Sequence, residues 1–178
     1  MKEFVFYNPT RMVFGAGSIA KLGKECQKLN INKVLLVIGQ KSVKNSGLLE
    51  KILTILKNAQ IDATLFEGVT PNPTTLQVEE GAKKARSFDA QAIVALGGGS
   101  VMDASKVIAL LAKQGGKAWD YTSTFLQKGK EVKEALPIIT IPTVAATGSE
   151  ADPIAVLNNP QTSDKNSVSG VALYPKLA

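Results

Sequence analysis

The chain alternates between two patterns of hydrophobic residues, nearly continuous apolar runs and apolar residues at helical spacing. Runs at residues 33–38, 92–96 and 136–141 are typical of strands buried on both faces, and residues 63–66 predict a further strand. Between the runs, apolar residues recur every three or four positions, which predicts amphipathic helices at 18–29, 47–59, about 74–87, and from 100 onward. Strands that alternate with helices of this length indicate an α/β domain, a Rossmann-like, doubly wound and mostly parallel sheet.

The two ends of the chain have a different pattern. Short apolar segments at residues 4–7 and 11–14 are separated by Asn8-Pro9, and we expect them to form an N-terminal β-hairpin added to the sheet. Near the other end, residues 154–157 predict a strand, and the polar stretch 158–169 predicts a loop. All 178 residues fit a single domain.

A glycine-rich turn lies in the middle of the chain. The apolar run at 92–96 leads into Gly97, Gly98, Gly99 and Ser100, and a helical pattern follows. Glycines let a backbone approach a ligand closely, and the first amides of a helix attract anions. The segment therefore points to a phosphate site.

The same segment has a plain structural interpretation. Ser100 and Asp103 have the S-x-x-D spacing of a capping box, which any helix can use. The glycines do not form the G-x-G-x-x-G dinucleotide fingerprint, and they do not follow the first strand of the domain. Taken alone, the segment leaves phosphate binding and a capped turn both open.

Three polar loops follow predicted parallel strands, at residues 39–42, 97–100 and 140–149. In doubly wound sheets, ligands bind beyond the carboxyl ends of the strands. Three such loops at one edge of the sheet favour a nucleotide cleft over a chance glycine turn.

Composition narrows the class of protein. The net charge of +6 comes with no dense basic cluster interleaved with aromatic residues, which argues against nucleic-acid binding. We found neither a secretory signal nor an apolar stretch of membrane-spanning length, so we expect a cytoplasmic protein without a membrane partner. The single cysteine, Cys26, is expected in the core or at its boundary. The chain has no histidine, which excludes a histidine general base or an imidazole metal site within these residues.

Four sequence strings resemble the iron-containing (group III) alcohol dehydrogenases. They are PTRMVFGAGS (9–18), PNPT (71–74), ALGGGSVMDASK (95–106) and IPTVAATGSE (141–150). A fifth string, GQKSVKNSGLL (39–49), is similar to the branch with NADPH-dependent butanol dehydrogenases and aldehyde reductases.

The resemblance implies a two-domain enzyme that transfers hydride between a nicotinamide dinucleotide and an alcohol or aldehyde. Residues 1–178 would be the dinucleotide-binding domain, and a C-terminal helical domain, absent from this chain, would hold iron or zinc through one Asp and three His. The string YPKLA (174–178) resembles one that precedes the first metal ligand, so all metal ligands would lie beyond residue 178. No residue here is predicted as a catalytic acid or base.

The resemblance also implies a set of cofactor contacts. Gly98, Gly99 and Ser100 would bind the pyrophosphate, with Gly97 also in the cofactor site, and Thr140 and Thr143 would lie near the adenosine half. The remaining contacts, to the diphosphate or the nicotinamide side, would come from Asn72, Asp103, Thr147, Ser149 and Lys165. Alternatives are a helix cap for Asp103, strand-end hydrogen bonds for Thr140 and Thr143, a turn for Thr147 and Ser149, and a solvated lysine for Lys165.

The loop after residues 33–38 bears on the choice of cofactor. An acidic residue at this place binds the ribose 2′-hydroxyl and selects NAD. Gly39 stands there instead, followed by Lys41 and Ser42, which could bind a 2′-phosphate. The sequence therefore predicts NADP(H) over NAD(H).

Two other functions and one partner stay open. A lyase of the dehydroquinate synthase type shares a glycine-rich dinucleotide loop, although GGGS together with TGSE fits the dehydrogenases better. A non-catalytic nucleotide-binding or assembly module is the alternative outside enzymes. Phe4, Val5 and Phe6 form a plausible exposed edge, so a homodimer through the N-terminal strands is a further expectation.

Overall fold

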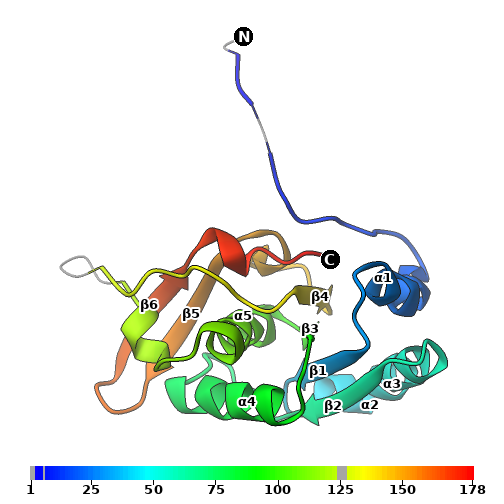
Figure 1. The fold of residues 1–178 in the computed structure, drawn as a ribbon, viewed down its shortest axis with the longest axis horizontal. Coiled ribbons are helices and arrows are strands. Elements are labelled where there is room, and N and C mark those ends of the chain that lie inside the picture. Colours follow the sequence, from blue (N-terminus) through cyan, green and yellow to red (C-terminus); the bar gives the residue numbers. More distant parts are fainter. Residues whose placement is uncertain (1–2, 6, 124–127) are drawn as a thin grey trace.

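A parallel four-stranded sheet forms the centre of the molecule in the computed structural model, which describes residues 3–5, 7–123 and 128–178 (Figure 1). Its strand order is β2-β1-β3-β4, and all three pairings are parallel. The strands are β1 (Lys33–Ile38), β2 (Asp62–Phe66), β3 (Ala92–Gly97) and β4 (Ile138–Pro142). This arrangement confirms the Rossmann-like, doubly wound α/β class.

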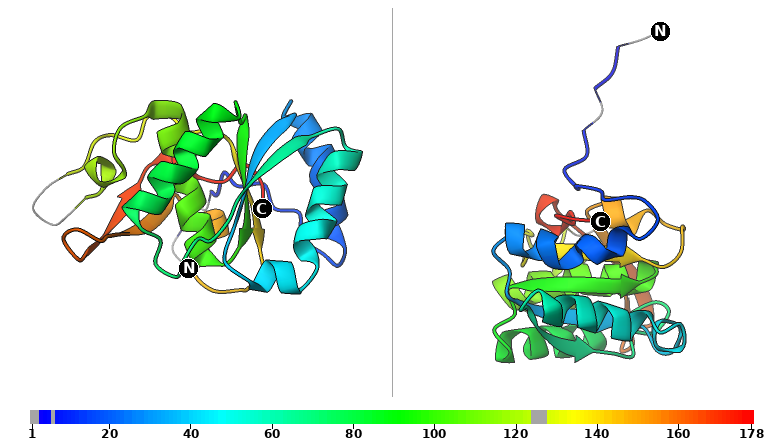
Figure 2. Two further views of the ribbon diagram at one scale, coloured as in Figure 1. Left: turned by 90° about the horizontal axis from the view of Figure 1, so that it is seen from below. Right: turned by 90° about the vertical axis from the view of Figure 1, so that its right-hand side faces the viewer.

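Helices cover both faces of the sheet (Figure 2). One face carries α1 (Leu22–Lys28), which follows the 3₁₀ turn η1 (Ser18–Lys21), and α3 (Leu48–Asn58). The other face carries α4 (Thr75–Ser87) and α5 (Gly99–Gln114). Alternate residues of β1 point to the two sides: Leu35 packs with the core under α4 and α5, and Leu36 with the core under α1 and α3. Double coverage explains the nearly continuous apolar runs of the two central strands, β1 and β3.

The expected helix boundaries hold to within a few residues, with one addition. Thr74 caps α4 through a capping box with Gln77. A short helix that we did not expect, α2 (Ser42–Asn45), begins inside the loop after β1. The other short 3₁₀ segments are η2 (Ala118–Tyr121), η3 (Ser149–Ala151) and η4 (Val171–Leu173).

The expected loop at 158–169 was wrong, because it contains a strand. β5 (Ile154–Asn159) and β6 (Asp164–Ser169) form an antiparallel pair that packs on the side of α5 away from the sheet. The sequence of β6 is polar, and Val168 is its one buried residue. Val168 packs in the same core as Leu157. The other side chains of β6 are half-buried or exposed, so the strand has no apolar run to detect.

The expected N-terminal hairpin was also wrong in the residues that the structure describes, since none of residues 3–5 and 7–17 lies in a named strand. Arg11 instead bridges Leu177 in parallel, and Leu177 bridges Ile139 of β4. The Val13 amide donates to Ala178 O (2.8 Å), and the Thr140 amide donates to Leu177 O (2.9 Å). Residues near both ends of the chain thus continue the sheet beyond β4, and this long-range pairing replaces the local one.

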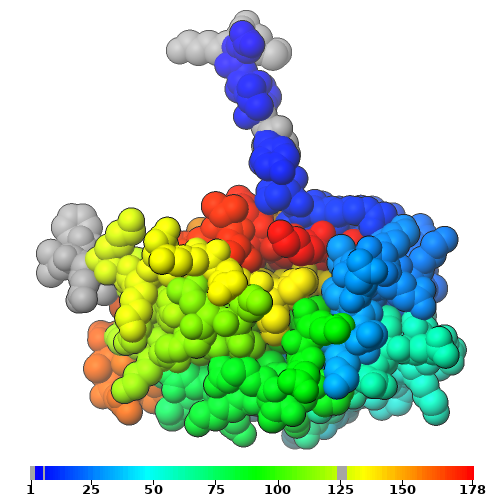
Figure 3. All heavy atoms as spheres, in the orientation of Figure 1, coloured from blue at the N-terminus to red at the C-terminus, as the bar shows by residue number. Residues whose placement is uncertain are grey.

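The segment before this pairing extends away from the body of the molecule (Figure 3). Phe4, Val5 and Tyr7 are 80%, 90% and 81% exposed, whereas Phe6 lies outside the described residues. In the described ranges, every helix is too short or too polar to span a bilayer.

A buried carboxylate anchors the paired N-terminal segment to α1. The Glu25 side chain is only 6% exposed, and it accepts hydrogen bonds from Arg11 and from Lys28, the latter at 2.8 Å. Hydrogen bonding from Arg11, followed by that from Lys28, lowers the pKa of Glu25 from 4.5 to about 2. Cys26 beside it is fully buried as expected, and burial raises the pKa of its thiol to about 11.

This carboxylate predicts a specific acid sensitivity. Because the pKa of Glu25 is lower in the folded state, the network stabilises the fold above about pH 4.5 and loses that contribution as the pH falls toward 2. We expect Glu25→Gln to be less stable than wild type at pH 7 and to lose less further stability on going to pH 3. Urea unfolding at both pH values measures this.

Glu67→Gln serves as the control, because the Glu67 carboxylate is 51% exposed in its ion pair with Lys44. Its pH dependence should match that of wild type. Equal acid sensitivity of wild type and Glu25→Gln would contradict the prediction.

Candidate functional site

The three polar loops meet at one edge of the sheet. β1, β3 and β4 are adjacent and parallel, so their carboxyl ends bring residues 39–42, 97–100 and 140–149 together. A cavity of about 360 Å³ lies between the first two loops, and Val69 and Pro71 complete its wall. Ser42 also lines a larger cavity of about 1000 Å³, which reaches Thr140 and Thr143. The cleft expected from sequence is therefore present.

The glycine turn opens α5 without a side-chain cap. Gly98 is the N-cap residue, and the first amide with a backbone acceptor is that of Val101, which donates to Gly98 O (3.0 Å). A Cβ atom on Gly99 would lie 2.9 Å from Thr147 Oγ1, and one on Gly97 would lie 2.6 Å from a methyl of Val101. The turn needs glycine for packing, and the amides ahead of Val101 lie beside the smaller cavity.

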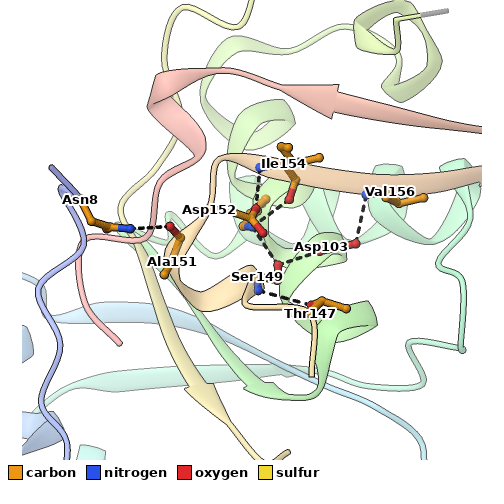
Figure 4. Close-up of polar contacts among 9 residues, drawn as sticks. Asn8, Asp103, Thr147, Ser149, Ala151, Asp152, Ile154 and Val156 are labelled. Atoms are coloured by element: carbon orange, nitrogen blue, oxygen red, sulfur yellow. Dashed lines mark hydrogen bonds and ion pairs between the residues drawn. The ribbon is translucent and has the colours of Figure 1, made fainter. Parts of the chain in front are cut away.

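Asp103 does not cap α5, so the S-x-x-D interpretation was wrong. Its carboxylate accepts from Ser149 Oγ at 2.7 Å and from the Val156 amide at 3.0 Å (Figure 4). Burial raises the pKa of Asp103, and these two hydrogen bonds partly oppose the rise. The side chain ties α5 to β5 and to the turn before it.

Lys106 is the residue that sequence reasoning missed. It is fully buried, and its Nζ donates to Ser149 Oγ, Asp152 Oδ1 and Ile154 O, each at 2.8 Å. Burial lowers the pKa of Lys106, while its hydrogen bond to the Asp152 carboxylate raises it. The available signal was a lysine three residues after Asp103 on a helix that is otherwise apolar at this level.

Three predicted residues from separate segments come together beside the first turn of α5. The Lys165 ammonium on β6 donates to Asn72 Oδ1 at 2.8 Å, and the Asn72 amide donates to Ser100 Oγ at 3.3 Å. Asn72 has φ 56°, a left-handed conformation that asparagine tolerates between its two prolines. The unexpected strand β6 brings Lys165 to this place. Contact of these side chains with a cofactor stays a prediction.

The remaining predicted residues divide into interior and surface positions. Thr140 and Ser149 are 2% and 1% exposed, and the Thr140 hydroxyl donates to Leu177 O at 3.3 Å. Thr143 and Thr147 are exposed, and Thr147 Oγ1 accepts from the Ser149 amide at 3.3 Å. The positions predicted to select the cofactor line the smaller cavity: Gly39, Lys41 and Ser42.

The part of the chain that the structure describes contains no candidate metal site. Residues 3–5, 7–123 and 128–178 contain no group of three or more Cys, Asp or Glu side chains placed to hold a metal ion.

Comparison with known proteins gives consistent matches over the whole chain. Residues 9–178 match the family described as "Iron-containing alcohol dehydrogenase". NADH-dependent butanol dehydrogenase B of Clostridium acetobutylicum is 39% identical over 178 residues, which are 100% of this chain and 43% of that protein. NADPH-dependent aldehyde reductase YqhD of Escherichia coli is 34% identical, covering 100% of this chain and 45% of that protein.

Solved structures agree with the sequence matches. The crystal structure of NADH-dependent butanol dehydrogenase A from Thermotoga maritima superposes with a TM-score of 0.91 at 40% identity, covering 99% of this chain and 44% of that one. The chain thus spans less than half the length of the relatives that it matches.

Proposed function

Since the chain belongs to the iron-containing alcohol dehydrogenase family, we propose that residues 1–178 are the dinucleotide-binding domain of a metal-dependent alcohol dehydrogenase or aldehyde reductase. The observation that carries this proposal is the uncapped glycine turn at the start of α5, which faces a cavity formed with the loop after β1. In such a domain a bound dinucleotide accepts or supplies the hydride.

The contribution of these residues is binding and orientation. The amides of Gly99 and Ser100 bind the pyrophosphate at the positive end of the α5 dipole. The larger cavity beside Thr143 takes the adenosine half, and Asn72 with Lys165 takes the nicotinamide ribose. The missing side chain at Gly99 lets Thr147 pack against the turn, and this packing sets the position of the amides.

The metal and most of the substrate pocket are proposed to lie in another domain. The described residues offer no metal-binding group, and we propose that a second, helical domain holds iron or zinc and most of the pocket for an alcohol or aldehyde. The family match over residues 9–178 favours this function over a lyase of the dehydroquinate synthase type and over a non-catalytic module.

Calorimetric titration of the protein with NADH and NADPH tests the proposal. We expect one binding site per chain and no alcohol oxidation by these 178 residues alone. Absence of binding to both dinucleotides would refute the proposal of a dinucleotide-binding domain. Alcohol oxidation by this chain would refute the proposal that the metal and substrate sites lie in a second domain.

We further propose a preference for NADP(H). Gly39 follows β1 in the smaller cavity, and Lys41 and Ser42 offer a cation and a hydroxyl to a 2′-phosphate. The names of relatives include both NADH- and NADPH-dependent enzymes, so this preference must come from the residues of this chain.

Gly39→Asp is expected to shift the ratio of NADPH to NADH affinity by about tenfold or more toward NADH, because a carboxylate repels the 2′-phosphate and binds the 2′-hydroxyl. A Cβ at this position meets only ordinary contacts of 3.7 Å, so the fold should tolerate the change. Dissociation constants for both cofactors measure the ratio, with Gly39→Ala as the uncharged control. An unchanged ratio of NADPH to NADH affinity in Gly39→Asp would contradict the proposed role of residue 39.

A homodimer through the N-terminal segment is also proposed. Phe4 and Val5 stand exposed on the stretch before Arg11, whose described residues lie in no strand. An exposed apolar segment of this kind favours pairing with a second copy. Sedimentation of the protein as a monomer over a range of concentrations would contradict it.

A further inference from the structure

A buried ammonium group lies directly beneath the proposed cofactor loops. Lys106 has 0% exposure, and its three hydrogen bonds use all three protons of the ammonium group. A buried charge is costly unless it is paired and fully hydrogen-bonded, so the partners of Lys106 are held in fixed positions.

Those partners belong to the turn that faces the glycines. Ser149 Oγ accepts from Lys106 and donates to Asp103, which fixes the direction of its hydroxyl proton. The Ser149 amide donates to Thr147 Oγ1, which is the atom nearest to the missing Cβ of Gly99. A continuous series of contacts therefore joins the ammonium of Lys106 to the glycine turn. Figure 4 shows the part of this series that runs through Asp103, Ser149 and Thr147.

The helix supplies the alignment. Gly99, Asp103 and Lys106 are spaced by four and three residues, so they lie on one face of α5. The helix therefore places Gly99 against Thr147, and it uses Asp103 and Lys106 in the next two turns to hold the same loop.

We infer that Lys106 is a positioning residue for dinucleotide binding: it holds residues 147–150 against the glycine turn without touching the ligand. The inference rests on the proposed function, because Lys106 is argued to support the same dinucleotide site without contacting the ligand. Direct contact is excluded, since Lys106 is 0% and Ser149 only 1% exposed. The effect of Lys106 on a ligand must pass through Thr147.

The test compares dissociation constants for NADH and NADPH in four proteins that are folded by circular dichroism. We expect Lys106→Met to weaken binding of both cofactors by about tenfold. Asp152→Asn keeps the shape of the acceptor but removes its charge, and it should weaken binding in the same direction by a smaller factor. Ser105→Ala is the matched control: Ser105 is the adjacent, fully buried residue of α5, and its hydroxyl has no partner among the described residues. It should leave both constants unchanged.

A double-variant comparison separates positioning from general destabilisation. If Lys106 acts through the turn, Thr147→Ala should weaken binding less in the Lys106→Met protein than in wild type. Wild-type affinity in folded Lys106→Met or, if that variant does not fold, in Asp152→Asn overturns the inference and leaves the proposed function standing. Fully additive losses would also overturn it. Failure of wild type to bind either cofactor overturns both.

Discussion

Replacing Gly99 by alanine is expected to weaken dinucleotide binding by about 100-fold, which corresponds to about 2.7 kcal/mol. The added Cβ would lie 2.9 Å from Thr147 Oγ1 and 3.4 Å from its methyl group. The new methyl must therefore displace Thr147 or move the first turn of α5. Either response moves the amides that bind the pyrophosphate in our proposal. Titration with NADPH and NADH measures the loss.

A second substitution tests whether crowding against Thr147 causes the loss of affinity. Thr147→Ala removes the two atoms nearest to the new methyl and leaves the Thr147 Cβ position at 3.8 Å, an ordinary contact. Gly99→Ala with Thr147→Ala should thus recover the urea midpoint of Thr147→Ala alone. Affinity should recover to that of Thr147→Ala alone, because the new methyl points toward Thr147 and no longer displaces the first turn of α5. Binding by Gly99→Ala within twofold of wild type would contradict the prediction.

The central sheet could be predicted from sequence because its strands are covered on both faces. Residues 34–38 are apolar throughout, and the helices on either side require that pattern. β6 could not be predicted in this way, since only Val168 of its residues is buried. The N-terminal hairpin failed for another reason: Arg11 pairs with Leu177, and no local pattern reports a partner 166 positions away in the sequence.

In the site, too, features set by neighbouring residues could be predicted, and features set by distant residues could not. The glycine turn is encoded within a few residues, and its position at the carboxyl edge follows from the order of strands and helices. Asp103 has cap spacing in the sequence, but its partners Ser149 and Val156 lie 46 and 53 residues away. Lys106 likewise binds groups 43 to 48 residues away. The sequence motif therefore contains the correct residues, and only the tertiary structure gives their roles.

Leu177→Ala is expected to lower the free energy of unfolding by about 3 kcal/mol. Leu177 is 6% exposed and packs in the core between the sheet and the helices α1 and α3. Its backbone also bridges Ile139 of β4 and Arg11, so a poorly packed side chain here loosens two pairings at once. Urea unfolding at pH 7 measures the change.

Leu76→Ala is the matched control, because the same substitution is made on α4 at a side chain that is 58% exposed. It should change stability by no more than about 0.5 kcal/mol. The substitution at Leu177 has a second consequence. Arg11 reaches Glu25 from the segment that Leu177 holds against β4, so loosening this segment should raise the lowered pKa of Glu25 toward its ordinary value. Leu177→Ala should then lose less further stability between pH 7 and pH 3 than wild type does. Equal losses would mean that the ion network holds the N-terminal segment without help from the strand pairing.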